Sequence, residues 1–333
     1  MSASPRMGEL ITANWTTQAV YVAAKLGISD LIHERGPQSA EELAGATGVL
    51  AEPLFRVLRA LASLKVYRQR DDGKFELTPL AEQLRQDVPG SQHAIAIMMG
   101  EEHYHAWGEL LYSVQTGKTA FDKIYGKPIF EWLGGHPEEA AVFDAAMVSI
   151  HGRETGAMID AYDFSQFGVL ADIGGGNGSV LRAILKKMPA VRAMLCDLPG
   201  VLERAKPLIA ADGLTDRIEL KPTNFFEAIP GGADVYLMRH IIHDWTDEQS
   251  LVILKNIRKV IGPSGKLLVI EGVVPSGNEP SFSKLLDLNM MVMPGGKERT
   301  EAEYRELFAA GGFRLERIVP TESEVQVLES VPV

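Results

Sequence analysis

Apolar residues along the chain follow two different spacings. Up to about residue 162 they recur at helical intervals, as at Leu54, Val57, Leu58 and Leu61. From about residue 166 short apolar runs alternate with helical patterns, which predicts an α/β doubly wound fold. The predicted strands cover 168–173, 191–197, 216–221, 233–238 and 265–274, with helices between successive strands, and then 313–319 and 323–330 after helices at 283–292 and 300–310.

Residues 38–80 are expected to form a small unit of helix, helix and β-hairpin. Ser39 and Glu42 give a capping-box pattern, and an Asp-Asp-Gly turn signal separates the two strands. This order is the winged-helix pattern, which serves either DNA binding or dimerisation. Over residues 1–90, 10 basic and 11 acidic residues nearly balance, which favours a dimerisation scaffold. The apolar helix or pair of helices at 7–28 has several apolar faces, and a partner subunit could cover one.

Residues 92–162 are predicted to be helical and are rich in aromatic, methionine and histidine side chains. A Gly-Gly-His-Pro break at 134–137 divides them, and Pro137 suits the first turn of the following helix. Core packing explains each of these side chains when it is taken alone. Taken together, they could also line a pocket for an aromatic substrate.

Composition narrows the classes of protein to which the chain can belong. Its 333 residues, 46% apolar and 23% charged, are ordinary for a globular protein with two domains. The net charge of −11 argues against a general nucleic-acid binder. Cys196 is the single cysteine, which excludes an intrachain disulfide and fits a reducing compartment. No signal peptide and no membrane-spanning run is visible, so we expect a cytoplasmic protein without a membrane partner.

The run from Val169 to Gly178, Val-Leu-Ala-Asp-Ile-Gly-Gly-Gly-Asn-Gly, joins a predicted strand to a predicted helix. Such a glycine loop lets a cofactor approach the backbone closely. Its spacing matches neither the dinucleotide fingerprint nor a phosphate-binding loop. The loop therefore suits a cofactor without a pyrophosphate, and S-adenosylmethionine is the obvious candidate. Asp172 could contact its ammonium group, and Asp197, at the end of the next strand, its ribose hydroxyls.

Four stretches resemble the motifs of a known family: Asp172-Ile-Gly-Gly-Gly-Asn-Gly, Asp197-Leu-Pro, Arg239-His-Ile-Ile-His-Asp-Trp and Gly295-Gly-Lys-Glu-Arg-Thr. Nearly the whole chain resembles the S-adenosylmethionine-dependent O-methyltransferases of the plant caffeate and acetylserotonin type and their bacterial relatives in natural-product pathways. The last two stretches are specific to that family. The resemblance implies a Rossmann-like methyltransferase sheet, an N-terminal helical, winged-helix-like dimerisation domain and a homodimer.

The resemblance also implies particular cofactor contacts. Asn224 stands where the family usually has an acid that reaches the adenine amino group, and its amide oxygen can still accept that hydrogen bond. Arg239 matches a basic residue near the cofactor, and Met147 matches an apolar contact. The expected cofactor-binding residues are Asp172, Gly174, Gly176, Asp197, Leu198, Asn224, Phe225, Arg239 and Met147.

Methyl transfer from a sulfonium is an SN2 displacement, in which the enzyme must align the acceptor oxygen and remove its proton. His243 matches the family's catalytic base, and a histidine with an ordinary pKa is neutral at pH 7 and can accept that proton. Glu271 and Glu298 match the two glutamates that bracket this base. We expect Asp244 to cap the helix that begins near Asp247, and otherwise to lie on the substrate side.

The acceptor pocket is expected to combine aromatic side chains with methionines, which adapt to flat rings. Core packing is nearly as good an explanation for Met293. The spacing His240-x-x-His243 beside Asp244 has a superficial likeness to a metal site, but further ligands do not stand out and a histidine base needs no divalent cation. We therefore expect no metal. The expected pocket residues are Trp107, Phe143, Met147, Asp244, Met290 and Met293.

The main hypothesis is an O-methyltransferase that acts on a phenolic or enolic hydroxyl of a small aromatic metabolite. A second hypothesis keeps the fold and the cofactor but uses them for hydroxylation or decarboxylation, and the complete set of base and glutamates disfavours it. A third is a DNA-binding regulator that senses a small molecule, which the acidic charge disfavours. The expected domains are 1–95 for dimerisation, 96–165 as a helical connector to the substrate pocket, and 166–333 for cofactor binding and catalysis.

Overall fold

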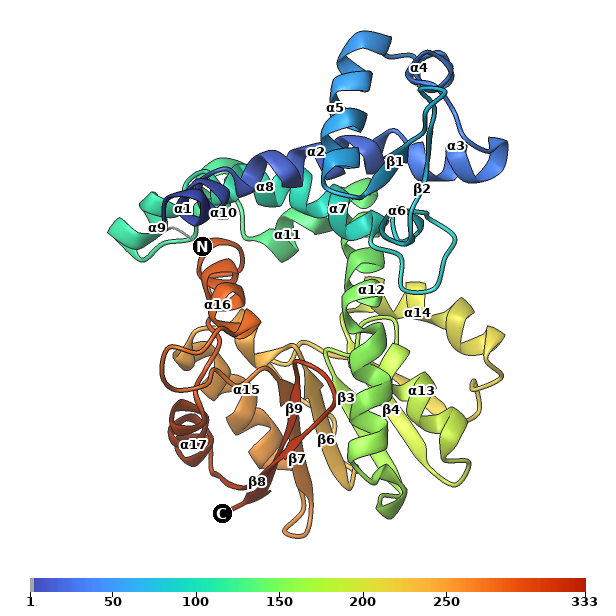
Figure 1. Cartoon of the computed structure of the whole chain (residues 1–333). Helices are drawn as coiled ribbons and strands as arrows, with labels where there is room; N and C mark the ends of the chain where they lie inside the picture. The colour runs from blue at the N-terminus through green and yellow to red at the C-terminus, as the bar shows by residue number, and fades with distance from the viewer. Residues whose placement is uncertain (1–2) are drawn as a thin grey trace. The chain divides into compact units, whose positions relative to one another are not determined.

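A computed structural model of the protein describes residues 3–333, and Figure 1 draws the elements in chain order. The chain divides into two compact units. The first consists of the residues up to Gly108 together with Phe130–Gly152, and the second of Glu109–Ile129 together with Arg153–Val333. Within the described residues, no helix is both long enough and apolar enough to cross a membrane.

The first unit consists of helices and one small antiparallel hairpin. The predicted order of helix, helix and hairpin in 38–80 is confirmed, and Ser39 and Glu42 form the predicted capping box. The break before Pro137 is confirmed as well. The elements are α1 (Ala3–Ile11), α2 (Ala13–Lys25), α3 (Ile28–Arg35), α4 (Ala40–Thr47), α5 (Ala51–Ser63), β1 (Tyr67–Gln69), β2 (Phe75–Leu77), α6 (Pro79–Glu82), α7 (His93–Gly100), α8 (Glu102–Trp107), α11 (Ile129–Gly134) and α12 (Pro137–Ala161), which continues into the second unit.

The second unit is built on a seven-stranded sheet in the order β5-β4-β3-β6-β7-β9-β8. The first five strands in this order, from β5 across to β7, run parallel to one another. Strand β9 is antiparallel to both β7 and β8. The elements are α9 (Leu110–Thr116), α10 (Ala120–Tyr125), η1 (Phe164–Gln166), β3 (Val169–Ile173), α13 (Ser179–Lys187), β4 (Arg192–Asp197), α14 (Pro199–Ala211), β5 (Ile218–Pro222), β6 (Val235–Arg239), η2 (Ile242–Asp244), α15 (Asp247–Val260), β7 (Lys266–Glu271), α16 (Phe282–Val292), α17 (Glu301–Ala310), β8 (Phe313–Pro320) and β9 (Gln326–Pro332).

The predicted strands are confirmed, but one predicted helix is wrong. Between β5 and β6 the chain forms only a short turn at 225–227, whereas we expected a helix between every pair of successive strands. Pro230, Gly231 and Gly232 follow this turn, and proline and glycine disfavour a helix in so short a connection. The other connections within the parallel part of the sheet contain helices, as expected.

The strand order places a topological switch between β3 and β6. The chain adds β4 and β5 on one side of β3, then returns to add β6 and β7 on the other side. In open α/β sheets, ligands bind at the carboxyl ends of the strands beside such a switch. The loops after β3, β4 and β6 meet there, so three of the predicted motifs lie at one edge of the sheet.

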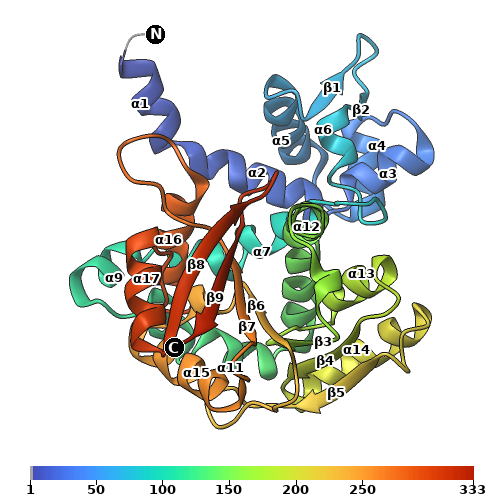
Figure 2. The same cartoon turned by 90° about the horizontal axis from the view of Figure 1, so that it is seen from below.

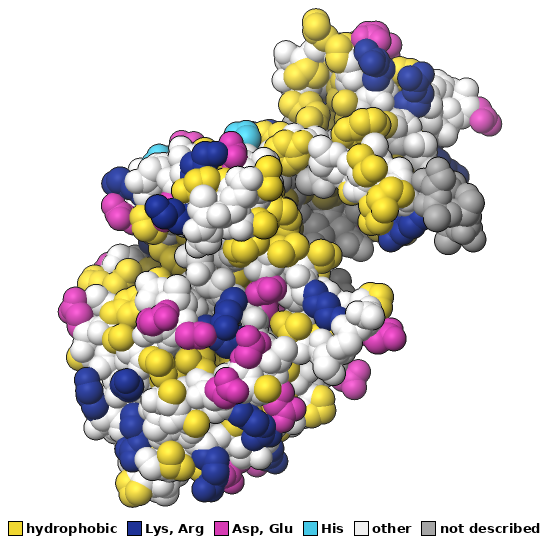
Figure 3. All heavy atoms as spheres, turned by 90° about the vertical axis from the view of Figure 1, so that its left-hand side faces the viewer, with side chains coloured by type: hydrophobic (Ala, Val, Ile, Leu, Met, Phe, Trp, Pro, Cys, Tyr) yellow, Lys and Arg dark blue, Asp and Glu magenta, His cyan; other side chains and the backbone are white. Residues whose placement is uncertain are grey.

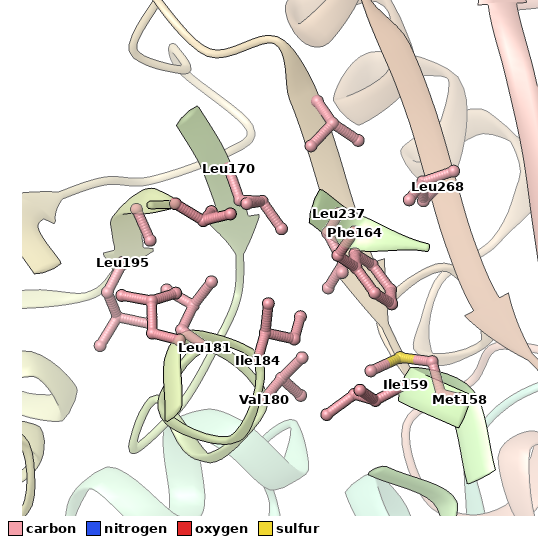
Figure 4. Packing of buried hydrophobic residues seen from close by; sticks show 14 of the residues in the cluster. Met158, Ile159, Phe164, Leu170, Val180, Leu181, Ile184, Leu195, Leu237 and Leu268 are labelled. Atoms are coloured by element: carbon pink, nitrogen blue, oxygen red, sulfur yellow. The ribbon is translucent and has the colours of Figure 1, made fainter. Parts of the chain in front are cut away.

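Two apolar layers cover the faces of the sheet. Helices α13 and α14 lie over one face together with the end of α12, and α15 and α17 lie over the other (Figure 2). Figure 4 shows Leu181 and Ile184 of α13 packed near Leu170 and Leu195 of β3 and β4. Each fully buried leucine or isoleucine contributes about 1.5–3 kcal/mol relative to an exposed one. These layers hold the strand ends, and hence the loops of the site, in fixed positions.

Charged side chains of both signs are mixed on the face drawn in Figure 3, where dark-blue Lys and Arg alternate with magenta Asp and Glu among the described residues. Elsewhere on the surface, exposed ion pairs join Lys187 to Asp160 and Arg305 to Glu301. Such exposed pairs contribute little to stability.

Candidate active site

The glycine loop follows β3 and leads directly into α13. Gly174 has a φ of 72°, and a Cβ built there would lie 2.5 Å from the Ile241 side chain. A Cβ at Gly175 would lie 2.6 Å from a carboxylate oxygen of Asp172. Neither position has room for a side chain, so the loop presents bare backbone at the end of β3. This matches the predicted cradle for a cofactor.

Asp172 is 1% exposed, and its Oδ2 has no hydrogen-bond partner among the described residues. Burial raises the pKa of Asp172 to about 7, Arg239 opposes this shift, and Asp197 adds to it. A buried carboxylate without a donor is costly unless a ligand supplies one. An ammonium group at this place would satisfy Asp172, so the residue fits the amino-acid end of S-adenosylmethionine.

Asp197, at the end of β4, connects two backbone segments of the site. Its Oδ2 accepts a hydrogen bond from the Gly176 N–H at 2.8 Å, and its Oδ1 accepts one from the Leu198 N–H at 2.7 Å. Each carboxylate oxygen can accept a further hydrogen bond. Asp197 can therefore hold the glycine loop and still accept the ribose hydroxyls. Leu198 itself is 54% exposed.

Asn224 and Phe225 form the turn after β5. The Asn224 amide oxygen accepts a hydrogen bond from the Phe226 N–H at 3.1 Å, and its nitrogen donates one to Glu227 at 2.9 Å. These contacts fix the orientation of the amide, and its oxygen retains a second acceptor position for an adenine amino group. A Cβ at Gly174 would lie 3.5 Å from the Phe225 ring, so this ring stands beside the glycine loop.

Arg239 joins the end of β6 to the helix after the glycine loop. Its Nη1 donates to Thr155 Oγ1 at 2.5 Å, and its Nη2 lies 3.5 Å from Ser179 Oγ, at the start of α13. Burial lowers the pKa of Arg239, while the charges of Glu154 and Asp172 oppose this shift. The structure thus places Arg239 beside the start of α13, and its contact with a cofactor stays a prediction.

His243 lies in the short helix η2 after β6, and its side chain is buried. Its Nδ1–H donates to Glu298 Oε1 at 2.6 Å, while its Nε2 lies 3.6 Å from Asp244 Oδ1. This contact fixes the imidazole tautomer and leaves Nε2 for the acceptor. Glu298 is 4% exposed, and its backbone N–H donates to Asp287 Oδ1 at 2.9 Å. The contact between His243 and Glu298 is the one the resemblance implied.

Glu271 has a different position from the one implied by a bracket around the imidazole. It lies at the end of β7 and is fully buried. Its Oε1 accepts the backbone N–H groups of Ile241, Ile242 and His243 at 3.1, 2.6 and 3.2 Å. Its Oε2 accepts the hydroxyl hydrogen of Tyr304 at 2.5 Å. Glu271 therefore holds the backbone of the turn that carries the base.

Two residues of the Gly-Gly-Lys-Glu-Arg stretch have roles that the sequence analysis missed. Arg299 is fully buried and donates to the carbonyls of Ile242 and Trp245 at 3.1 and 3.0 Å, and to Asp247. A Cβ at Gly296 would lie 2.0 Å from the His243 carbonyl oxygen. The stretch therefore packs directly on the backbone of the base. Its family specificity was a signal, but it gave no role for these two positions.

The charge state expected for His243 is wrong. Burial disfavours the imidazolium, but Asp244 and the hydrogen bond to Glu298 outweigh it and raise the pKa of His243 to about 10. At pH 7 the imidazole is therefore protonated, whereas an ordinary pKa would leave it neutral. Its basicity is close to that of a phenolate, whose conjugate acid has a pKa near ~10.

The expected capping role of Asp244 is also wrong. Thr246 caps α15, and Gln249 completes a capping box with it. Asp244 instead lies beside the His243 ring, and burial raises its pKa to about 7. The positive charge of His243 opposes this rise, and the charges of Glu271 and Glu298 add to it. The structure thus places Asp244 on the Nε2 side of the base, where an acceptor would lie.

The remaining predicted pocket residues are divided between the two units. Met290 and Met293 are buried at the end of α16 in the second unit. The other three, Trp107, Phe143 and Met147, are half-buried in the first unit. A pocket that they share stays a prediction.

His240 was one of the two histidines in the weak metal-site pattern. Its Nε2 lies 2.9 Å from Glu154 Oε2, and its ring centroid is 5.0 Å from that of His243. One ring nitrogen of His240 is therefore directed to Glu154, and one of His243 to Glu298. Each of the two histidines thus has a carboxylate of its own.

Comparison with protein families gives two matches along the chain. Residues 107–314 match the family described as O-methyltransferase domain, and residues 9–87 match the O-methyltransferase dimerisation domain. Together the matched regions contain the glycine loop, the base with its glutamate, and the small winged-helix-like unit.

Several characterised proteins are similar over nearly their whole length. The phenazine O-methyltransferase PhzM of Lysobacter antibioticus is 45% identical over 98% of this chain and 95% of its own. The mitomycin biosynthesis 6-O-methyltransferase of Streptomyces lavendulae is 37% identical over 96% of this chain and 91% of its own. The 3-amino-4-hydroxybenzoate 4-O-methyltransferase of Streptomyces cremeus is 36% identical, with 98% and 90% covered.

Solved structures show the same fold. The crystal structure of LaPhzM has a TM-score of 0.96, 44% identity and full coverage of both chains. The O-methyltransferase NcsB1 from neocarzinostatin biosynthesis, solved with S-adenosylmethionine and 2-hydroxy-5-methyl naphthoic acid, has a TM-score of 0.86, 32% identity and 96% coverage of each chain.

Proposed function

Since this chain belongs to the S-adenosylmethionine-dependent O-methyltransferase family, we propose that it methylates a hydroxyl group of a small aromatic metabolite, with His243 as the general base. The observation that carries the proposal is the His243 imidazole, held through Nδ1 by Glu298 at 2.6 Å. This base follows β6, the strand that pairs with β3, whose end carries the glycine loop. A proton acceptor and a methyl-donor site thus belong to adjacent strands.

The cofactor, when bound, supplies a methyl group that is already activated on a sulfonium. Asp172 would hold its ammonium group, Asp197 its ribose hydroxyls, and the backbone of the glycine loop would lie against it. The protein must then align the acceptor oxygen with that methyl group, exclude water and take up one proton. We assign the proton to Nε2 of His243.

The carboxylates beside His243 determine where the proton and the charge go during the reaction. The acceptor O–H bond breaks as the oxygen gains the methyl group, and the proton remains on Nε2. Glu298 stabilises the resulting imidazolium through Nδ1. Because His243 is protonated at pH 7 before the acceptor binds, the acceptor either binds as its anion or binds neutral with release of one proton to solvent. Both routes give the same bound complex, in which His243 and the acceptor oxygen have one proton between them.

The acceptor class follows from the relatives and from Asp244. The similar proteins are named for phenazine, mitomycin and 3-amino-4-hydroxybenzoate, and the last name places an amino group next to the methylated hydroxyl. Asp244 lies beside Nε2 of His243, so it can accept a hydrogen bond from a second donor near the reacting hydroxyl. We therefore propose an aromatic acceptor with such a neighbouring hydroxyl or amino group, and Met290 and Met293 near its ring.

We also propose that the protein is a homodimer formed through its first unit. Residues 9–87 match a dimerisation domain. Helices α1 and α2 expose Met7, Leu10, Ile11 and Trp15, with 55–71% of each residue accessible. Such a cluster of large apolar side chains is typical of a surface that a second subunit covers.

The proposal is tested by methyl transfer in vitro. The purified protein is incubated with S-adenosylmethionine labelled in its methyl group and with a panel of hydroxylated bicyclic and tricyclic aromatics. We expect label on an acceptor oxygen, a loss of at least about a hundredfold in kcat for His243→Ala, and no loss for the control His33→Ala, whose side chain is exposed on α3. Absence of labelled product from every acceptor, or full activity of His243→Ala, would contradict the proposal.

A further inference from the structure

Tyr304 belongs to the site although no motif includes it. We propose that Tyr304 is a positioning residue for the base His243, and that it acts by holding Glu271 in a backbone nest formed by residues 240–243. This inference rests on the proposed function, because it assigns a role in placing the base. It differs from a bracket of two glutamates around the imidazole, since Glu271 acts on the main chain.

The nest is formed by an unusual turn after β6. His240 has a φ of 54°, and Ile241 then returns to the right-handed helical region. The N–H groups of Ile241, Ile242 and His243 lie at the start of the short helix η2, where no preceding helical turn supplies their acceptors, so they can converge on an anion. Glu271 Oε1 is that anion and accepts the N–H groups of Ile241, Ile242 and His243. A non-glycine residue keeps such a conformation only where its surroundings enforce it.

Tyr304 completes the coordination of the same carboxylate. It lies on α17, is fully buried, and donates its hydroxyl hydrogen to Glu271 Oε2 at 2.5 Å. Both oxygens of Glu271 therefore have donors, one from the nest and one from Tyr304. Without the hydroxyl, a buried carboxylate oxygen would lose its donor, and the carboxylate would turn to find another.

The consequence for His243 is geometric. Glu298 fixes one nitrogen of the ring, and Glu271 fixes the main chain from which the ring projects. A displacement of the turn would move Nε2 relative to the acceptor oxygen, and displacements of about 1 Å can reduce a rate by about a hundredfold. The Tyr304 hydroxyl donates its hydrogen bond to Glu271 and not to a residue predicted to bind the acceptor or the cofactor, so its loss should lower kcat and leave KM nearly unchanged.

The first test compares two matched variants. Tyr304→Phe removes the hydroxyl that holds Glu271. The control Tyr162→Phe removes another buried hydroxyl, which donates to Glu329 at 2.8 Å and has no contact with the turn. We expect Tyr304→Phe to lower kcat about tenfold with KM values within about twofold, while Tyr162→Phe keeps kcat within about twofold. Equal kcat values for the two variants would overturn the proposal.

A second test asks whether Tyr304 acts through Glu271. Glu271→Gln removes the negative charge that both the three backbone N–H groups and the Tyr304 hydroxyl bind, so in this variant Tyr304 has no carboxylate left to hold. If both residues act in one path, the double variant Tyr304→Phe/Glu271→Gln has the kcat of Glu271→Gln alone, because the two losses overlap. Losses that multiply would show that Tyr304 acts independently, and would refute the mechanism.

A third measurement does not depend on methyl transfer. The clamp, by which we mean Tyr304 holding Glu271 against the turn, protects the amide hydrogens of residues 241–243. Their hydrogen exchange should therefore be at least about tenfold faster in Tyr304→Phe than in Tyr162→Phe. Equal exchange rates would overturn the clamp. If the wild-type protein methylates no acceptor, the proposed function fails, while the exchange measurement still decides whether Tyr304 holds the turn.

Discussion

The substitution Glu298→Gln tests whether Glu298 sets the basicity of His243. The change removes one negative charge and keeps the size of the side chain, and the amide oxygen can still accept the Nδ1–H, which now lies 2.6 Å from the carboxylate. A hydrogen bond to a charged partner contributes about 1.5–3 kcal/mol. Because one pKa unit corresponds to about 1.36 kcal/mol, the pKa of His243 should fall by about one to two units.

The assay is the pH dependence of kcat/KM for the acceptor at saturating cofactor. The pKa of His243 is raised to about 10, so the wild-type rate should increase with pH up to that region as the imidazolium loses its proton. In Glu298→Gln this rising limb of the pH profile should move to lower pH by about one to two units. The plateau should fall about tenfold to a hundredfold, because the imidazolium formed in the reaction loses the same stabilisation.

Two controls make the result specific. The exposed residue Glu306 lies on α17, so Glu306→Gln should leave both the limb and the plateau unchanged. Two acceptors with different hydroxyl pKa values separate the ionisation of the acceptor from that of the enzyme. A limb that stays in place or moves to higher pH in Glu298→Gln would refute the reasoning.

Three further predictions concern the backbone around the base and the buried Asp172. Gly296→Ala places a Cβ 2.0 Å from the His243 carbonyl oxygen, so we expect a destabilisation of about 1–3 kcal/mol and a large loss of kcat, measured by urea unfolding and initial rates, whereas Gly262→Ala, where a Cβ meets no atom within 4 Å, should be neutral. Arg299→Lys loses the fork that holds two carbonyls and Asp247, so unfolding should become easier by about 3 kcal/mol, and wild-type stability in this variant would contradict the account. Burial raises the pKa of Asp172 to about 7, so the folded state binds more protons than the unfolded state between about pH 4 and 7, and stability falls as pH rises through that window. Asp172→Asn should remove this loss, about 3–4 kcal/mol in total, and a parallel pH dependence of the two unfolding free energies would contradict the assignment.

Most of the fold could be predicted from local patterns in the sequence. The glycine loop and the strands around it were predictable, because a buried apolar run followed by glycines is continuous in sequence. The helix expected between β5 and β6 was wrong, since alternation alone does not show how short a connection can be. In that connection Pro230 and two glycines were local signals against a helix.

The predicted site depended on the resemblance wherever distant segments meet. His243 and Glu298 are 55 positions apart, and their pairing follows from motif matching and not from local pattern. Asp244 was assigned to a cap because its sequence neighbourhood resembles a helix start, while the structure directs it to His243. The raised pKa of His243 depends on the charges gathered around it in three dimensions, which spacing along the chain does not reveal.

Tyr304 and Arg299 show a different limit. Tyr304 occupies a buried position on an amphipathic helix, so its sequence pattern is that of an ordinary core residue. Its partner Glu271 binds backbone N–H groups, and no residue type in the sequence marks such a contact. The left-handed conformation of His240 beside it is likewise seen only in the structure. Contacts made to main-chain atoms by a fully buried side chain therefore became visible only in the folded structure.

The most direct test of the account compares acceptors of graded acidity in the wild-type protein and in His243→Gln. If His243 removes the acceptor proton, the variant loses at least about a hundredfold in rate with an ordinary phenol, whose pKa is near ~10. With a fluorinated analogue that is already ionised at the assay pH, no base is needed, and the deficit should shrink to about tenfold or less. An equal deficit for both acceptors, or none for either, would contradict the role of His243 as the base.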